Sequence, residues 1–144
     1  MGVKLGNDYL LWVKVGAGAY TVVSGQGDLS IKRSATAFST GSKTSSGYDT
    51  QDVGLRQGSA SLKLMPDLPD AGFTALEGAA LANPQEAFSI QVRKGSTAGA
   101  DPDDVVFECL VKSTDFNADY PKSGPVSVDA TFIYITAPTV DALA

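Results

Sequence analysis

Histidine is missing from all 144 residues of the sequence. This absence excludes catalytic sites of the Ser-His-Asp and Cys-His types, the commonest general base near neutral pH, and most zinc sites. Paired carboxylates can also catalyse reactions, but nothing in the sequence places two of them in a defined cleft. We therefore expect no enzymatic activity, no metal site and no cofactor.

Cysteine is almost as scarce, because Cys109 is the only one. A single cysteine cannot form an intramolecular disulfide, and it leaves the redox compartment undetermined. Its setting, VVFECLVK, is typical of a β-strand. We interpret Cys109 as a packed structural thiol and not as a nucleophile.

Long apolar runs and an excess of positive charge are missing too. No segment approaches the roughly 20 apolar residues of a membrane-spanning helix, and the first residues lack the pattern of a secretory signal. The formal net charge of -5 argues against a protein that captures nucleic acid or anionic membranes. The composition is that of a globular domain, expected to be soluble and made in the cytoplasm.

Three short patterns match ligand-binding motifs only in part. GSKT at 41–44 lacks the first glycine of a phosphate loop, and GAGAYT at 16–21 lacks the third glycine of a dinucleotide fingerprint. Asp115, Asn117 and Asp119 match the first three ligand positions of a calcium loop, but Tyr120 stands where that loop requires glycine. We interpret residues 115–119 as an acidic turn.

Alternation of apolar and polar residues, typical of half-buried β-strands, recurs along most of the chain. In one such segment Ala60, Leu62 and Leu64 alternate with serines and a lysine. The pattern predicts strands over residues 9–15, 19–23, 28–33, 57–65, 88–93, 105–112 and 126–135.

A single helix is expected within MPDLPDAGFTALEGAALANP, residues 65–84, with Asp67 or Asp70 as its N-cap. Gly72 and Gly78 each weaken this helix by about 1 kcal/mol relative to alanine, so packing against a sheet has to hold it. The residues predicted to pack on the sheet are Phe73, Leu76 and Ala80. Together the elements predict one domain over residues 1–144, an antiparallel β-sandwich or flattened barrel with one flanking α-helix.

The polar stretch SATAFSTGSKTSSGYDTQDVG, residues 34–54, separates two of the predicted strands. Loops beyond about 12 to 15 residues are uncommon in compact domains and are usually functional or disordered. As an extended hairpin of about ten residues each way, at about 3.3 Å apiece, it would reach roughly 30 Å from the body. A flexible surface loop is the alternative reading.

The chain as a whole resembles the major tail (tail tube) proteins of long-tailed bacteriophages and gene transfer agents. The resemblance rests on GDLSIKRSATAFSTGSKTSSGYDTQDVGLRQGSASLKLM, on the helix in DAGFTALEGAALANP, and on FECLVKSTDFNADYPKSGPVSVDATFIYITA. It implies a structural protein of the virion tail, assembled in the bacterial cytoplasm. Homo-hexameric rings of that family stack into a tube for DNA passage, with tape-measure, tail-tip and tail-terminator proteins as partners and no membrane.

The resemblance also implies roles for particular segments. Residues 34–54 would form an inter-ring loop that reaches the adjacent ring, and residues 1–8 and the C-terminal tail 138–144 would also bridge rings. The loop residues expected to make inter-ring contacts are Phe38, Lys43, Tyr48, Asp49 and Asp52.

The polar faces of the predicted strands are candidates for the surface of the channel, with charges of both signs. Their charged residues are Lys32, Lys63, Arg93, Glu108, Lys112 and Asp129. The alternative function is a monomeric β-sandwich binding module, an adhesin or carbohydrate-recognition domain, with Trp12, Tyr20 and Tyr48 as stacking residues. Trp12 stands at the start of an apolar strand, which predicts a core residue instead.

Overall fold

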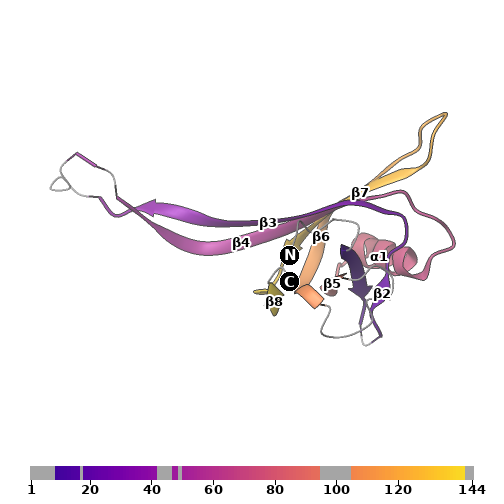
Figure 1. Ribbon diagram of the computed structural model, residues 1–144, viewed down its shortest axis with the longest axis horizontal. Coiled ribbons are helices and arrows are strands. Elements are labelled where there is room, and N and C mark those ends of the chain that lie inside the picture. Colours follow the sequence, from indigo (N-terminus) through magenta and orange to yellow (C-terminus); the bar gives the residue numbers. More distant parts are fainter. Residues whose placement is uncertain (1–8, 17, 42–46, 49, 95–104, 142–144) are drawn as a thin grey trace, which may run out of the picture.

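The computed structural model of the protein describes residues 9–16, 18–41, 47–48, 50–94 and 105–141. Figure 1 shows a body of strands and one helix, from which a long two-stranded arm extends. The elements are β1 (Tyr9–Lys14), β2 (Thr21–Val22), β3 (Gln26–Ser39), β4 (Gln51–Leu64), α1 (Ala71–Leu81), β5 (Phe88–Lys94), β6 (Val105–Asp119), β7 (Ser127–Tyr134) and β8 (Val140–Asp141).

The strands form one antiparallel sheet in the order β2-β1-β5-β6-β7-β4-β3, with β8 paired to β6. β6 is the longest strand, and β5 pairs with it only from Val105 to Val111. The other edge of β6 pairs first with β8 and then, from Val111 to Asp119, with β7. The far end of β6 therefore leaves the body together with β7, as a second projecting hairpin (Figure 1).

The sheet curls until its two ends meet at Gln26, the first residue of β3. The backbone N–H of Leu11 donates to Gln26 Oε1 at 2.9 Å. Gln26 Nε2 donates in return to the carbonyls of Leu11 at 2.8 Å and Val23 at 2.7 Å. The side-chain amide of Gln26 thus hydrogen-bonds the backbone of Leu11 as a neighbouring strand would, and it connects β3 to β1. The prediction of a mainly antiparallel β fold with one helix is confirmed.

The hydrophobic core lies inside this curled sheet and under α1. Phe88 and Phe132 meet edge to face at its centre, with ring centroids 5.7 Å apart. Cys109 is buried there as expected, and burial raises the pKa of its thiol to about 11. The buried cluster comprises Leu11, Val13, Val23, Ala60, Leu62, Leu64, Phe73, Leu76, Phe88, Ile90, Val92, Val106, Phe107, Cys109, Val111, Val128, Ala130 and Phe132.

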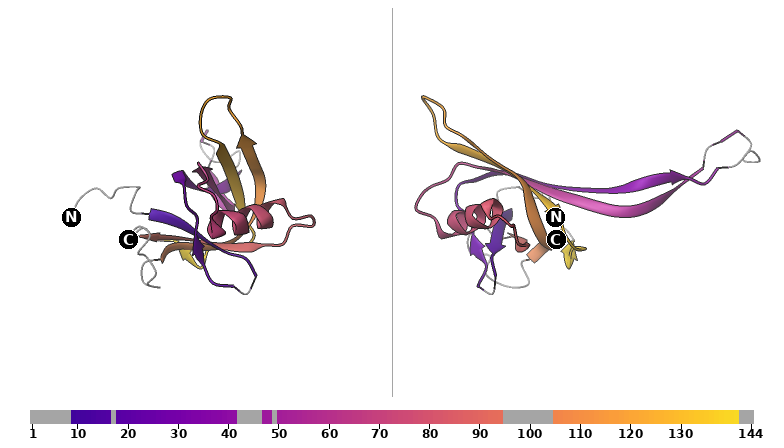
Figure 2. Two further views of the ribbon diagram at one scale, coloured as in Figure 1. Left: turned by 90° about the vertical axis from the view of Figure 1, so that its right-hand side faces the viewer. Right: turned by 180° about the vertical axis from the view of Figure 1, so that it is seen from behind.

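The helix lies against β1, β2 and β6, where it covers one end of the core (Figure 2). Asp70, not Asp67, is its N-cap, and its carboxylate accepts hydrogen bonds from the backbone N–H groups of Phe73 and Ser24. One side chain therefore both starts the helix and ties it to the strand region before β3. The residues of the predicted apolar stripe, Phe73, Leu76 and Ala80, are buried.

The expectation of an acidic turn at residues 115–119 is wrong, because this segment is the last part of β6. Asp115, Asn117 and Asp119 are exposed and alternate with Phe116, which packs against the core cluster. That alternation is a strand pattern, and β7 supplies the backbone partners along its whole length. The partial match to a calcium loop led to the prediction of a turn, although the alternation of exposed and packed side chains in residues 115–119 is that of a strand.

Candidate assembly interface

The arm, defined here as residues 34–57, is a β-hairpin that stands away from the body (Figure 1). Its strands pair from Ser34 with Gln57 to Ser39 with Gln51, and Thr40 then donates its backbone N–H to the Thr50 carbonyl at 2.7 Å. Residues 34–39 and 51–54 of the stretch that could have been a flexible loop are therefore strand. Backbone pairing holds the arm together with side-chain contacts such as that between the hydroxyls of Thr40 and Thr50 at 2.9 Å, and the core cluster contains no arm residue.

Large apolar side chains on the arm are exposed to solvent. The exposed fractions are 50% for Phe38, 79% for Tyr48, 56% for Val53 and 87% for Leu55. A folded chain gains nothing from such exposure, and apolar surface of this kind is typical of interaction sites. Val53 and Leu55 escaped sequence reasoning, although an isolated leucine in a Ser-, Thr- and Gly-rich segment was an available signal.

Of the three polar arm residues predicted to make inter-ring contacts, the structure describes one, Asp52. Asp52 is exposed, and its Oδ1 accepts a 2.7 Å hydrogen bond from the next backbone N–H, that of Val53. Lys43 and Asp49 lie outside the described residues. Whether these residues make contacts between copies therefore remains a prediction.

Two strand edges are available for pairing with another chain. Among the described residues, β3 pairs only with β4, and β6 beyond Ser113 pairs only with β7, whereas the backbone N–H and carbonyl of Ser113 are bonded to the side chain of Gln85. Between these edges lies a four-stranded unit, β3-β4-β7-β6, in which every neighbouring pair is antiparallel. Unpaired backbone groups along a strand are a template for pairing with another strand.

The outer face of this four-stranded unit carries four of the predicted channel residues. Lys63 lies directly across from Asp129, and Lys112 lies across from Ile133. Lys32 joins the second of these rows through Ser59. Asp115 and Asp119 add further negative charge on the same strands, so the face has charges of both signs and no positive excess.

The remaining two candidates, Arg93 and Glu108, lie further along the sheet, on β5 and β6. The Arg93 guanidinium stacks 4.4 Å from the ring centroid of Trp12 and 5.5 Å from that of Tyr20. The Tyr20 hydroxyl donates to Glu108 Oε1 at 3.1 Å, and burial raises the pKa of this hydroxyl. The side chains of Arg93, Tyr20 and Glu108 therefore contact one another, and the charges of Arg93 and Glu108 are of opposite sign.

Trp12 is buried, as predicted, but it lies outside the main core cluster. Only 9% of its surface is exposed, but Leu11 and Val13 point into the core cluster and Trp12, between them, points to the opposite face. Because Arg93 covers its ring, Trp12 offers no open platform for a sugar. This removes one of the stacking residues of a carbohydrate-binding module.

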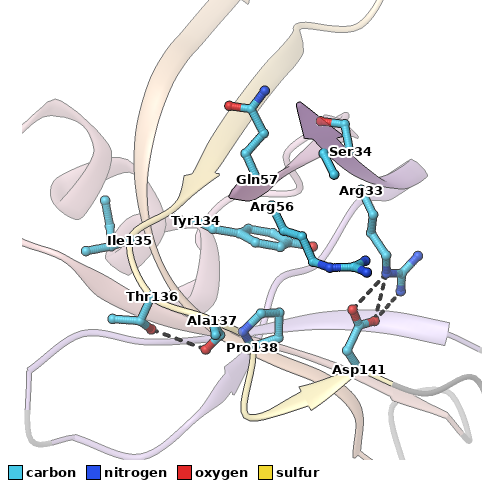
Figure 3. Close-up of a pocket in the computed structure, with 11 residues that line it drawn as sticks. Arg33, Ser34, Arg56, Gln57, Tyr134, Ile135, Thr136, Ala137, Pro138 and Asp141 are labelled. Atoms are coloured by element: carbon cyan, nitrogen blue, oxygen red, sulfur yellow. Dashed lines mark hydrogen bonds and ion pairs between the residues drawn. The ribbon is translucent and has the colours of Figure 1, made fainter. Parts of the chain in front are cut away.

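A pocket of about 570 Å³ opens where the arm leaves the body (Figure 3). Arg33 and Arg56 line it from the arm side, and Tyr134, Pro138 and Asp141 from the other. Arg33 Nε donates to Asp141 Oδ2 at 2.8 Å and to Oδ1 at 3.0 Å, and Arg33 Nη2 also donates to Oδ1. These hydrogen bonds lower the pKa of Asp141 and raise that of Arg33.

Two kinds of feature are absent from the described residues. No three His, Cys, Asp or Glu side chains in the described ranges gather closely enough to hold a metal ion. The described part of the chain also contains no helix with the length and apolar character needed to span a bilayer. What it does offer is strand edges, an arm with exposed apolar residues and a pocket at the base of that arm.

Comparison with known structures decides the fold. A chain from the tail of an empty gene transfer agent (GTA) particle, solved with C6 symmetry, superposes with a TM-score of 0.76 over 97% of this chain and 100% of that one, at 17% identity. The SPP1 tail tube gives 0.74 over 96% and 80%, at 12% identity. The chain has the tail tube fold. A sheath–tube complex of a contractile injection system gives 0.62 over 96% and 91%, at 11% identity.

No protein-family model and no curated protein matches the chain. The tail tube fold nevertheless extends over nearly its whole length, including the arm. The structures that share it are parts of multi-subunit tail assemblies.

Proposed function

We propose that the protein is the structural subunit of a tail tube, in the virion tail of a phage, a prophage or a gene transfer agent. Copies self-assemble into hexameric rings, and the rings stack into a channel for DNA. The observation that carries this proposal is the superposition of almost the entire chain on tail components at TM-scores of 0.73 to 0.76. The proposal includes no catalytic activity.

Ring closure follows from the two strand edges. In the unit β3-β4-β7-β6 the strand direction alternates, so β3 and β6 run in opposite directions. When β3 of one copy lies beside β6 of the next, the new pair is antiparallel, like every other pair in the sheet. Such a contact is heterologous, and repeated rotation closes it into a ring in which no edge stays open.

Stacking of rings is the role that we assign to the arm. It extends beyond the body, and its exposed residues Phe38, Tyr48, Val53 and Leu55 are covered only when another copy approaches. Burial of apolar surface stabilises such a contact by about 25 cal/mol per Å². Lys43, Asp49 and Asp52 are its proposed polar partners, and segments 1–8 and 138–144 are proposed to bridge rings as well.

The outer face of the four-stranded unit becomes the wall of the channel. Its lysines at 32, 63 and 112 are balanced by aspartates at 115, 119 and 129, among many serines and threonines. A wall without positive excess does not retain phosphates, because affinity for DNA depends on cationic contacts. Tape-measure, tail-tip and tail-terminator proteins are the proposed partners inside and at the ends of the tube.

Electron microscopy of the purified protein at rising concentration tests this function. We expect rings or tubes with sixfold symmetry, seen in negative stain. A chain that stays monomeric at every concentration, salt and pH, and also in the presence of tail-tip protein, would remove the proposal.

Shortening the arm separates assembly from folding. Residues 38–52 are replaced by Asn-Gly, which joins Ala37 to Val53, residues that already face each other across the hairpin. The core loses no residue, so the unfolding midpoint stays near that of the wild type, while tubes no longer elongate. Tubes of normal length from the shortened chain would contradict the role of the arm.

A further inference from the structure

The pocket at the base of the arm has more positive than negative charge. It is lined by Arg33 and Arg56 but by only one acidic residue, Asp141. Arg33 is bound to Asp141, whereas Arg56 makes no ion pair within the described ranges. In Figure 3 the Arg56 side chain reaches across the ring of Tyr134 toward the open side of the pocket. A carboxylate entering the pocket would meet this guanidinium.

The rest of the pocket wall is largely apolar. Ile135 and Pro138 form one side, and the ring of Tyr134 forms the floor. The hydroxyl oxygen of Tyr134 is buried and has no hydrogen-bond partner among the described residues. Ile135 itself is 42% exposed, although it continues a strand of the core. The occupant that fits is therefore an extended segment with apolar side chains and one carboxylate.

The β4 strand of the arm has this chemistry. Between Gln51 and Leu55 lie the exposed carboxylate of Asp52 and the exposed side chains of Val53 and Leu55. These residues are paired with β3 and run directly into Arg56, so they cannot turn back into the pocket of their own chain. The arm of a second copy brings the same chemistry to the pocket from outside.

We propose that this pocket is the receptor for the arm of another copy, with Asp52 of the incoming arm bound to Arg56 and with Val53 and Leu55 against Ile135 and Pro138. The inference rests on the proposed function and identifies the surface that receives the arm. Each chain then carries the donor residues and the receptor pocket on neighbouring parts of the arm. Such a contact is heterologous, because it joins different surfaces of the two copies. When repetition of a heterologous contact does not close a ring, it produces an open-ended filament.

A charge exchange tests the pairing. The variants Arg56→Glu and Asp52→Arg each place like charges together at the contact, and we expect the critical concentration for tube formation to rise at least about tenfold. The double variant Arg56→Glu/Asp52→Arg restores an attractive pair and should polymerise close to the wild type. Lys122→Glu, at an exposed turn away from the pocket, is the matched control and should change little.

Cysteine cross-linking locates the contact independently of charge. Val53→Cys and Ile135→Cys are made in separate chains with different tags, and the native Cys109 is buried in both. Mixed tubes should yield the disulfide between the two tagged chains under mild oxidation. Its absence from well-formed tubes, or failure of the double charge variant to recover, overturns the inference.

The outcomes separate the two proposals. If the wild type and Arg56→Glu form tubes equally well, the receptor is elsewhere and the tail tube function stands. If the wild type forms no tubes under any condition, the proposed function fails and the inference fails with it. Circular dichroism of each variant shows that loss of tubes reflects a lost contact and not a lost fold.

Discussion

Alanine substitutions at two glycines of the same helix are expected to shift stability in opposite directions. A Cβ atom at Gly72 would lie 2.1 Å from the carbonyl oxygen of Val22 and 2.7 Å from its carbonyl carbon. These are backbone atoms, so no side-chain rotation relieves the clash. At Gly78, which is exposed, a Cβ atom would have nothing within 4 Å. The same chemical change therefore meets a strand at one position and solvent at the other.

The magnitudes follow from these surroundings. Gly78→Ala only removes the entropic cost of glycine in a helix and should stabilise the protein by about 0.5 to 1 kcal/mol. Gly72→Ala gains the same amount but forces α1 away from β2, and overpacking of this kind costs about 1 to 3 kcal/mol. We expect a net loss of about 1 to 2 kcal/mol, or a few degrees in Tm for a domain of this size.

Urea unfolding followed by far-UV circular dichroism measures both effects, with Gly78→Ala as the internal control. Equal m-values in all three proteins establish that the denatured state is unchanged. A Gly72→Ala variant as stable as Gly78→Ala would refute the close approach of α1 to β2. It would also support the simpler view, taken from the sequence, that both glycines merely weaken the helix.

Three other predictions concern side chains outside the helix. Arg93→Ala should uncover Trp12, the only tryptophan, and shift its fluorescence emission to longer wavelength, whereas an unchanged spectrum would show that Arg93 does not cover the ring. Asp141→Asn should cost less than about 1 kcal/mol at pH 7, since its ion pair is largely exposed. Because the folded pKa of Asp141 lies below its ordinary value of 3.8, that contribution is present above this pH and is lost as the pH falls through the folded pKa, so wild type and variant should converge in acid. Cys109, with a pKa of about 11, should react with thiol reagents at pH 8 only after unfolding, and rapid labelling of the native protein would contradict its burial.

Most of the fold was predictable because strand periodicity depends on local sequence. All seven predicted strands exist, and the helix begins at one of its two predicted caps, Asp70. The predicted ends of the strands were less accurate in the arm, where polar residues are exposed on both faces of the hairpin. Ser, Thr and Gly in residues 34–39 and 51–56 form strands because a partner strand supplies hydrogen bonds, and no apolar alternation records that pairing.

Features that depend on tertiary contact were beyond sequence reasoning. β8 is two residues long and is defined by its pairing with Phe107 and Glu108. The pocket at the base of the arm joins residues more than 100 positions apart, Arg33 and Asp141 among them. The face on which Trp12 lies follows from the register of β1, which the apolar run from Tyr9 to Val13 does not reveal.

A cryo-EM reconstruction of the polymerised protein tests the central claim most directly. Our account predicts that backbone density joins β3 of one copy to residues 115–119 of β6 in the next, as an antiparallel pair around a closed ring. Assemblies in which both of these edges face solvent, or a particle that is a lone subunit at every concentration, would contradict it.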